Sequence, residues 1–271
     1  MKKTTTLLLA ALVSSASAGD FAQNIIPTTN DELRALSADR PDSTETPITV
    51  DKGHWQIETS VLGVAKDSSG GNRTETWTWG ETNIKYGLTD NIDFQLIFAP
   101  YVYERSEVNG NLTETEDASD ITLRLKWNLW GNDGGATSFA LFPYVTIPTQ
   151  TEVSGGQWEA GIILPFAIDL SDKWSLGLQA EFAYVYDDED REYDLDLLHT
   201  AVLGYSVTER LGVYVEYLGI ASSSSDPYES HFSTGFTYAI NDTFQWDIGA
   251  VYGINDAAED SNIFTGFTKK F

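Results

Sequence analysis

The chain has 271 residues, a formal net charge of -25, eight tryptophans and no cysteine. Its 16 lysines and arginines, set against 41 aspartates and glutamates, leave no basic stripe to neutralise phosphates, which argues against a nucleic-acid partner. Without cysteine there are no disulfides and no metal–thiolate sites. Aromatic residues make up 13% of the chain and glycine is plentiful, which favours strands over helices.

The first residues are organised like the secretory signal peptide of a Gram-negative protein. Lys2 and Lys3 precede an apolar stretch at 7–13, and Ala16-Ser-Ala18 forms a small-x-small cleavage site before Gly19. The apolar stretch is far shorter than the roughly 20 residues that a spanning helix needs. We therefore predict a signal peptide at residues 1–18, which directs export.

Residues 19–52 are polar and lack the alternation of a strand. Within 38–58, two prolines and several Asp and Thr residues specify extended, turn-rich backbone before the first strand. We predict a periplasmic N-terminal lead-in over 19–52 and a barrel domain over 53–271.

A hairpin at 84–103 shows the pattern that recurs through the rest of the chain. Ile84, Tyr86 and Leu88 share one face, and a second alternating segment follows the turn at 89–91. About 12 such segments follow residue 53, an even number, as in single-chain bacterial barrels. Their approximate ranges are 55–65, 76–88, 92–103, 121–130, 138–147, 158–170, 174–186, 194–207, 211–221, 231–240, 244–254 and 263–271. Pro100, Pro143 and Pro165 cannot donate to a ladder, so we expect local bulges there.

Connection lengths alternate along the chain. Short turns, such as 89–91 and 208–210, alternate with longer polar segments such as 66–75 and 104–120, which is the outer-membrane pattern of short periplasmic turns and long external loops. The acidic runs at 114–117 and 187–190 are expected in external loops. Solvation is their ordinary role, and divalent-cation bridging to lipopolysaccharide or weak calcium binding is the alternative.

The segment 121–129 shows the facing most clearly, because its apolar residues alternate without a break with Thr122, Arg124, Lys126 and Asn128. A soluble sandwich would bury the apolar face, whereas a membrane barrel would expose it to lipid. Aromatic residues at strand ends favour the barrel, as interfacial girdles require; they are Trp55, Trp127, Trp130, Trp158, Trp174, Tyr205, Tyr217, Tyr238 and Trp246. The fold class is therefore all-β, an antiparallel transmembrane β-barrel of the bacterial outer membrane with about 12 strands.

The last strand carries an expected insertion signal. Phe267 and the final Phe271 share one face, which resembles the C-terminal signal that the outer-membrane insertion machinery recognises. Lys269 lies on the same face and departs from the usual pattern, at little cost if it lies near an interface.

The stretch Ala38-Asp-Arg-Pro-Asp-Ser-Thr-Glu-Thr-Pro-Ile-Thr-Val50, with Gly53-His-Trp-Gln-Ile-Glu58 and Lys85-Tyr-Gly-Leu-Thr-Asp-Asn91, carries a family resemblance. It resembles the outer-membrane transporter family linked by name to the meta-pathway of phenol degradation. The resemblance covers about residues 38–271. It implies an outer-membrane location and uptake of small molecules, including aromatic or hydrophobic compounds.

The inward polar residues of such a barrel are the candidate functional residues. They are Glu58, Lys85, Asp93, Arg124, Lys126, Glu159, Gln179, Glu181, Glu216 and Asp247. These groups either line a solute path or pair across a narrow lumen and plug it, and their acidic excess predicts a preference for cations.

We predict a channel or transporter for passive uptake of small solutes, whose partners are outer-membrane lipid, lipopolysaccharide, the insertion machinery and the solute. A non-conducting structural or adhesive barrel is the alternative, and a secreted all-β binding protein is a more distant one. No nucleophile elbow or metal-ligand spacing occurs around the three histidines, so we predict no catalytic residue, no metal and no cofactor.

Overall fold

A computed structural model describes residues 33–187, 191–224 and 226–271. The predicted signal peptide at 1–18, the lead-in as far as residue 32 and part of the 187–190 acidic run lie outside these residues. The strands are β1 (Trp55–Ser69), β2 (Asn72–Gly87), β3 (Ile92–Phe98), β4 (Tyr101–Val108), β5 (Asn111–Asp117), β6 (Ile121–Trp130), β7 (Thr137–Ile147), β8 (Glu159–Asp169), β9 (Trp174–Asp187), β10 (Glu192–Ser206), β11 (Leu211–Ser222), β12 (Glu229–Asn241), β13 (Phe244–Gly253) and β14 (Ser261–Lys270). No helix within the described ranges is long and apolar enough to cross a membrane.

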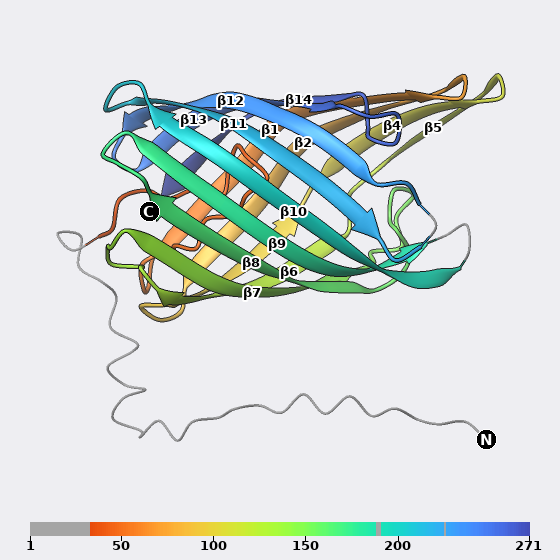
Figure 1. Ribbon diagram of the computed structural model, residues 1–271. Coiled ribbons are helices and arrows are strands. Elements are labelled where there is room, and N and C mark those ends of the chain that lie inside the picture. Colours follow the sequence, from red (N-terminus) through yellow and green to blue (C-terminus); the bar gives the residue numbers. More distant parts are fainter. Residues whose placement is uncertain (1–32, 188–190, 225) are drawn as a thin grey trace, which may run out of the picture.

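The strands form a closed antiparallel β-barrel (Figure 1). β3 and β4 both pair with β2 and are two parts of one long strand, and β5 and β6 together make the next strand. β1 pairs with β14 and closes the cylinder. The predicted barrel of about 12 strands is confirmed.

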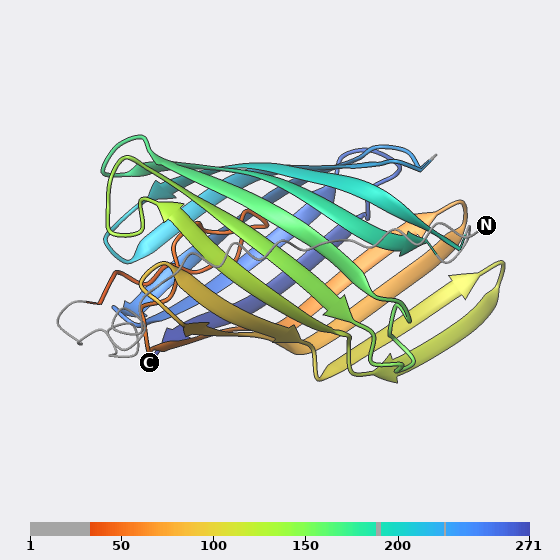
Figure 2. The ribbon, with the colours of Figure 1, turned by 90° about the horizontal axis from the view of Figure 1, so that it is seen from below.

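The two ends of the barrel differ. At the short-turn end, three turns close in the same way, with Leu88, Leu170 and Val207 each donating a backbone N–H to the residue four positions later at 2.9 Å. The other end, here called the long-loop end, carries the hairpins β1–β2 and β4–β5, which project beyond the rest of the barrel (Figure 2).

These two hairpins correct the expectation of long loops at 66–75 and 104–120. β1 and β2 pair as far as Ser69 and Asn72, and the acidic residues at 114–117 belong to β5. The chain reverses through Gly70-Gly71 and Asn109-Gly110, all four of which have positive φ. Such two-residue turns continue the strands beyond the apolar band, so the polar residues flanking them are strand residues.

The facing predicted from alternation is confirmed in β6. Leu125 and Trp127 are 39% and 45% exposed, whereas Lys126 between them is fully buried. The same inversion holds around the barrel, because its buried side chains are largely polar and many large apolar residues are exposed. An exposed apolar band of this kind is typical of a barrel whose outer surface contacts membrane lipid.

The expected bulges at three prolines are not found. β3 ends before Pro100 and β4 starts after it, yet their pairing with β2 keeps one register, and Pro143 and Pro165 pair with Ile162 and Gln179 without a shift. A proline lacks one donor, which interrupts hydrogen bonding without requiring an extra residue. The register shifts lie away from these prolines, between Ser60 and Leu62, between Ala239 and Asn241, and between Asn128 and Trp130.

Residues 34–52, here called the plug, lie inside the short-turn half of the barrel (Figures 1 and 2). This corrects the expectation of a periplasmic lead-in for the described part of 19–52. The physical reason is that the plug carries polar and charged groups that pair with inward-facing side chains, as described next.

Candidate functional site

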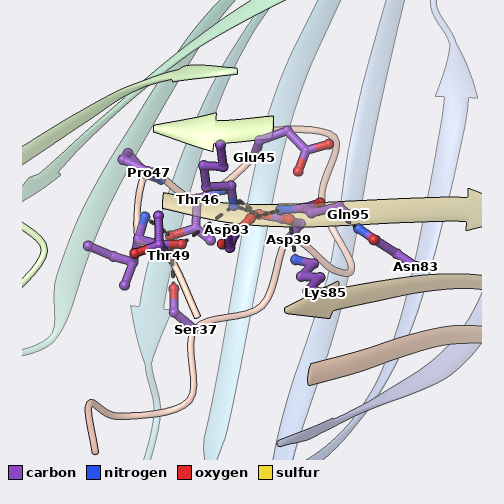
Figure 3. A network of polar contacts seen from close by, with 12 residues as sticks. Ser37, Asp39, Glu45, Thr46, Pro47, Thr49, Asn83, Lys85, Asp93 and Gln95 are labelled. Atoms are coloured by element: carbon purple, nitrogen blue, oxygen red, sulfur yellow. Dashed lines mark hydrogen bonds and ion pairs between the residues drawn. The ribbon is translucent and has the colours of Figure 1, made fainter. Parts of the chain in front are cut away.

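Asp39 is the centre of the plug's contacts (Figure 3). Its carboxylate accepts hydrogen bonds from Lys126 Nζ at 2.8 Å and from Lys85 Nζ, and both lysines are buried. The backbone N–H groups of Asp39 and Arg40 donate to the Glu58 carboxylate at 3.1–3.2 Å, and Glu58 also pairs with Lys85. One plug residue therefore joins strands β1, β2 and β6.

Arg40 joins the plug to β13 and β1. Its guanidinium makes a forked contact with the Asp247 carboxylate, with N–O distances of 2.7 and 3.3 Å, and it also donates to Ser60. The guanidinium carbon lies 5.5 Å from the centroid of the Phe264 ring. A planar guanidinium suits both contacts, because it binds carboxylates through two donors and stacks on aromatic faces.

Glu216 receives the next part of the plug. The backbone N–H of Ser43 donates to both carboxylate oxygens at 3.0–3.1 Å, and the Thr44 hydroxyl donates at 2.7 Å. The backbone N–H of Glu45 donates to Gln179 at 2.7 Å. Strands β9 and β11 are thereby hydrogen-bonded to the plug.

Glu45 joins the plug to Arg124 of β6. Arg124 Nη1 lies 2.6 Å from Glu45 Oε1, and the guanidinium carbon lies 5.5 and 5.8 Å from the ring centroids of Phe142 and Tyr144. Glu45 Oε2 and Arg124 Nε are buried and have no hydrogen-bond partner. The pair is therefore less completely satisfied than the Asp39 cluster.

The plug returns to the wall near the short-turn end. Asp51 pairs with Lys270 Nζ at 2.9 Å, and the backbone N–H of Val50 donates to Asp93 at 2.9 Å. Gly87 leaves room for this passage, because a Cβ there would lie 2.1 Å from the Asp51 backbone oxygen. A larger residue at this position would push the plug away from β2.

These ion pairs explain why the plug stays in the lumen. A buried charge without a partner is costly, and breaking a buried pair by removing one member costs about 3–5 kcal/mol. Lys85, Lys126 and Asp247 are almost completely buried. They face a lumen in which Asp39 and Arg40 supply the opposite charges.

Two plug carboxyl groups have raised pKa values. Burial and the nearby Asp39 raise the pKa of Glu45 to about 8, despite the opposing effect of Arg124. Burial and the nearby Glu216 raise the pKa of Asp42 well above its ordinary value. The charge of the plug therefore changes with pH.

Two cavities lie on opposite sides of the plug. One of about 330 Å³ is lined by wall residues that include Ala65 and Asn262, towards the long-loop end. The other, of about 240 Å³, is lined by residues that include Ser206 and Gly212, next to a short turn. Arg40, Pro41 and Asp42 line both cavities, so this turn of the plug separates them.

The predicted lumen residues fall into two groups. Eight contact the plug directly: Glu58, Lys85, Asp93, Arg124, Lys126, Gln179, Glu216 and Asp247. Glu181 instead accepts a hydrogen bond from the Tyr144 hydroxyl at 2.6 Å, and Glu159 accepts one from the Tyr186 backbone at 3.2 Å. That any of them line a solute path stays a prediction.

Sequence reasoning missed the plug side of every pair, and also Lys270. The signal was present in the segment 38–50, which carried the family resemblance and is rich in Asp, Thr and Pro. Its composition indicates extended backbone but does not show which wall residues it would contact. The histidines lie apart, with His54 bonded to the Phe271 backbone oxygen, His199 to Tyr228 and His231 to Glu229.

A family model described as "Putative MetA-pathway of phenol degradation" matches residues 38–271. The match starts within the plug and includes the whole barrel. The sequence matches no curated protein with significance.

Solved structures share the fold. An outer membrane channel from Pseudomonas putida F1 is 13% identical, with a TM-score of 0.64 over 87% of this chain and 100% of that one. The translocator domain of autotransporter NalP from Neisseria meningitidis is 10% identical, with a TM-score of 0.52 over 81% and 88% of the two chains. The β domain of the Bordetella autotransporter BrkA is 11% identical, with a TM-score of 0.50 over 81% and 99%. At these identities the comparison establishes an outer-membrane barrel fold.

Proposed function

The chain belongs to the family described as "Putative MetA-pathway of phenol degradation", and from this premise we propose that it is a restricted outer-membrane channel for passive uptake of small solutes. The family description and the P. putida channel support transport, and the family description points to aromatic compounds among the solutes. The proposal assigns no reaction to the protein.

The observation that carries this proposal is the pair of cavities separated by the Arg40–Asp42 turn of the plug. A barrel filled by side chains along its whole length would have no such spaces on both sides of one obstacle. Here the plug is held by polar contacts rather than by apolar packing. A hydrogen bond that water can replace has a net value of only about 0.5–1.5 kcal/mol, so the hydrogen bonds made by the Ser43–Glu45 part of the plug can be exchanged for water as a solute passes.

We assign the short-turn end to the periplasm, since outer-membrane barrels have short periplasmic turns and longer external loops. The plug then enters the barrel from its periplasmic end. A solute from outside would first reach the cavity bordered by Arg124 and Phe264 and would then meet Asp42. No ion pair is formed by Asp42 within the described ranges, and its raised pKa makes the charge of this turn depend on pH.

Single-channel conductance of the full mature chain in planar bilayers tests the proposal. We expect small steps for the wild type and steps several times larger for Asp39→Asn/Glu45→Gln, because both substitutions weaken the attachment of the plug to the wall. Asp172→Asn, in the exposed β8–β9 turn, removes a charge at the short-turn end without touching the plug and should leave the steps unchanged.

A closed structural barrel is the competing function, favoured by the number of ion pairs that bind the plug. A closed barrel would show no conductance in the wild type, in the double variant Asp39→Asn/Glu45→Gln or in Asp172→Asn. Thermal unfolding of the three proteins in detergent would show whether the variants are folded, so that silence of a folded Asp39→Asn/Glu45→Gln variant would contradict a channel.

A further inference from the structure

An apolar groove lies on the outer wall at the short-turn end, where β14 passes between β1 and β13. It has a volume of about 440 Å³ and is lined by Ile57, Asn241, Phe244, Phe267, Lys269 and Phe271. The rings of Phe244 and Phe267 pack edge to face at 5.8 Å. The groove faces away from the lumen, because the neighbouring residues Gln56 and Thr268 are the buried, inward ones.

Lys269 is the exception on this surface. It lies directly between Ile57 of β1 and Phe244 of β13 in the ladder. The other outward residues of β13 and β14 are uncharged: Phe244, Trp246, Ile248, Ala250 and Tyr252, with Ser261, Ile263, Thr265 and Phe267. A lysine on a lipid-facing surface lowers stability unless its charge reaches the interface, so its presence suggests a function for the charge.

The contacts of Lys269 place its charge at the rim of the groove. Nζ donates to the Thr243 hydroxyl in the β12–β13 turn at 2.7 Å and lies 5.7 Å from the centroid of the Phe271 ring. Neither contact is with an anion. The aliphatic part of the side chain crosses the apolar surface while the ammonium group reaches the interface, as lysines near membrane boundaries do.

We propose that this groove binds one anionic glycerophospholipid of the periplasmic leaflet, with an acyl chain along Ile57, Phe244 and Phe267 and the phosphate against Lys269. The groove supplies apolar area of the right shape for a chain, and the ammonium supplies a charge complementary to the headgroup. Charge complementarity is local, because the protein as a whole carries -25 and repels anions elsewhere. The groove is continuous with the apolar band that faces lipid, which makes a lipid its natural occupant.

The test is a titration of the detergent-refolded full mature chain with dioleoylphosphatidylglycerol, followed by native mass spectrometry. Dioleoylphosphatidylcholine is titrated in parallel. We expect Lys269→Gln to weaken phosphatidylglycerol binding about tenfold, as the loss of one charge-assisted contact predicts. Lys269→Arg should keep the affinity, and Phe244→Ala should weaken both lipids, because it shortens the chain-binding surface.

Lys173→Gln is the matched control. Lys173 lies in the β8–β9 turn at the same end, and its Nζ is 6.0 Å from the centroid of the Tyr205 ring, but it does not line the groove. If Lys173→Gln lost as much affinity for phosphatidylglycerol as Lys269→Gln, the lipid would be attracted by any positive charge at this end of the barrel, and the proposed site would be wrong. Unchanged affinity in Lys269→Gln would also contradict the site. If Lys269→Gln impaired assembly in cells but not lipid binding, the groove would serve the insertion machinery and the lipid proposal would be wrong. Refolding in detergent does not use that machinery, so the titration is independent of it.

Discussion

The inner and outer faces of the same strands follow opposite rules. On β6, Leu125 and Trp127 are exposed and need only a lipid surround, whereas Arg124 and Lys126 point inward and each pairs with a carboxylate of the plug. An outward apolar residue can contact any lipid chain, but an inward charge needs a partner of opposite charge at one position. A substitution should therefore have different consequences on the two faces.

Removing the central partner should have the largest effect. Asp39→Ala leaves Lys126 without its ion-pair partner and Lys85 with Glu58 alone. We expect the free energy of unfolding to fall by about 3–5 kcal/mol, the usual cost of breaking a buried pair. Urea unfolding in detergent, followed by tryptophan fluorescence, measures it. Asp172→Ala is the control, and equal midpoints for the two variants would refute the importance of the Asp39 cluster.

A charge on the outer face should have the next largest effect. Leu125→Arg should lower stability by about 2–4 kcal/mol if the position lies near the bilayer midplane. Arg124→Leu, one residue away, should cost less, because Glu45, whose pKa is raised to about 8, already holds a proton at neutral pH and is not left as a buried unpaired charge. Insertion into liposomes and the unfolding midpoint of each variant can be compared, and similar damage from both would mean that the two faces are wrongly assigned.

A smaller effect is expected from an added methyl group at Gly87. The new Cβ would collide with the Asp51 backbone, and overpacking of this kind costs about 1–3 kcal/mol. Because the plug gives way more easily than the wall, Gly87→Ala should also increase conductance. Gly63→Ala is the control, since its Cβ would meet nothing closer than 3.7 Å. Unchanged conductance in Gly87→Ala would indicate that the plug does not limit flow.

The smallest effect concerns pH. Glu45 has a pKa raised to about 8 in the folded protein, so the docked plug binds a proton that a free glutamate releases near pH 4.5. The stabilisation from this protonation is complete below about pH 4.5 and is lost as pH rises towards 8. Glu45 and Asp42 both gain negative charge over this range or above it, so cation preference should increase with pH. Reversal potentials in a KCl gradient at pH 6 and pH 9 measure it, and Glu45→Gln/Asp42→Asn should remove the change.

The barrel could be predicted because its signal is local and repeated. Alternation with a period of two assigns each residue of β6 to a face, and the short turns at 89–91 and 208–210 fix where strands reverse. The hairpin tips show the limit of this reasoning, because Asn109-Gly110 is a strong turn signal within a segment whose polarity predicts a loop. The strands there lack apolar alternation, because no apolar face is needed beyond the membrane, so their sequence does not show the strand pattern.

The sequence by itself determined the strands, their facing and the excess of inward charge. Only the tertiary structure decided where those charges find partners, because Arg40 and Asp247 lie 207 residues apart and meet only when β14 closes on β1. Residues 34–52 have no hydrophobic periodicity. Their sequence predicts an extended polar segment, and such a segment could lie in water as well as in the lumen. The closed wall makes the difference, because it gathers Lys85, Lys126 and Asp247 around one lumen, where the charges of residues 39 and 40 can be buried and paired with them.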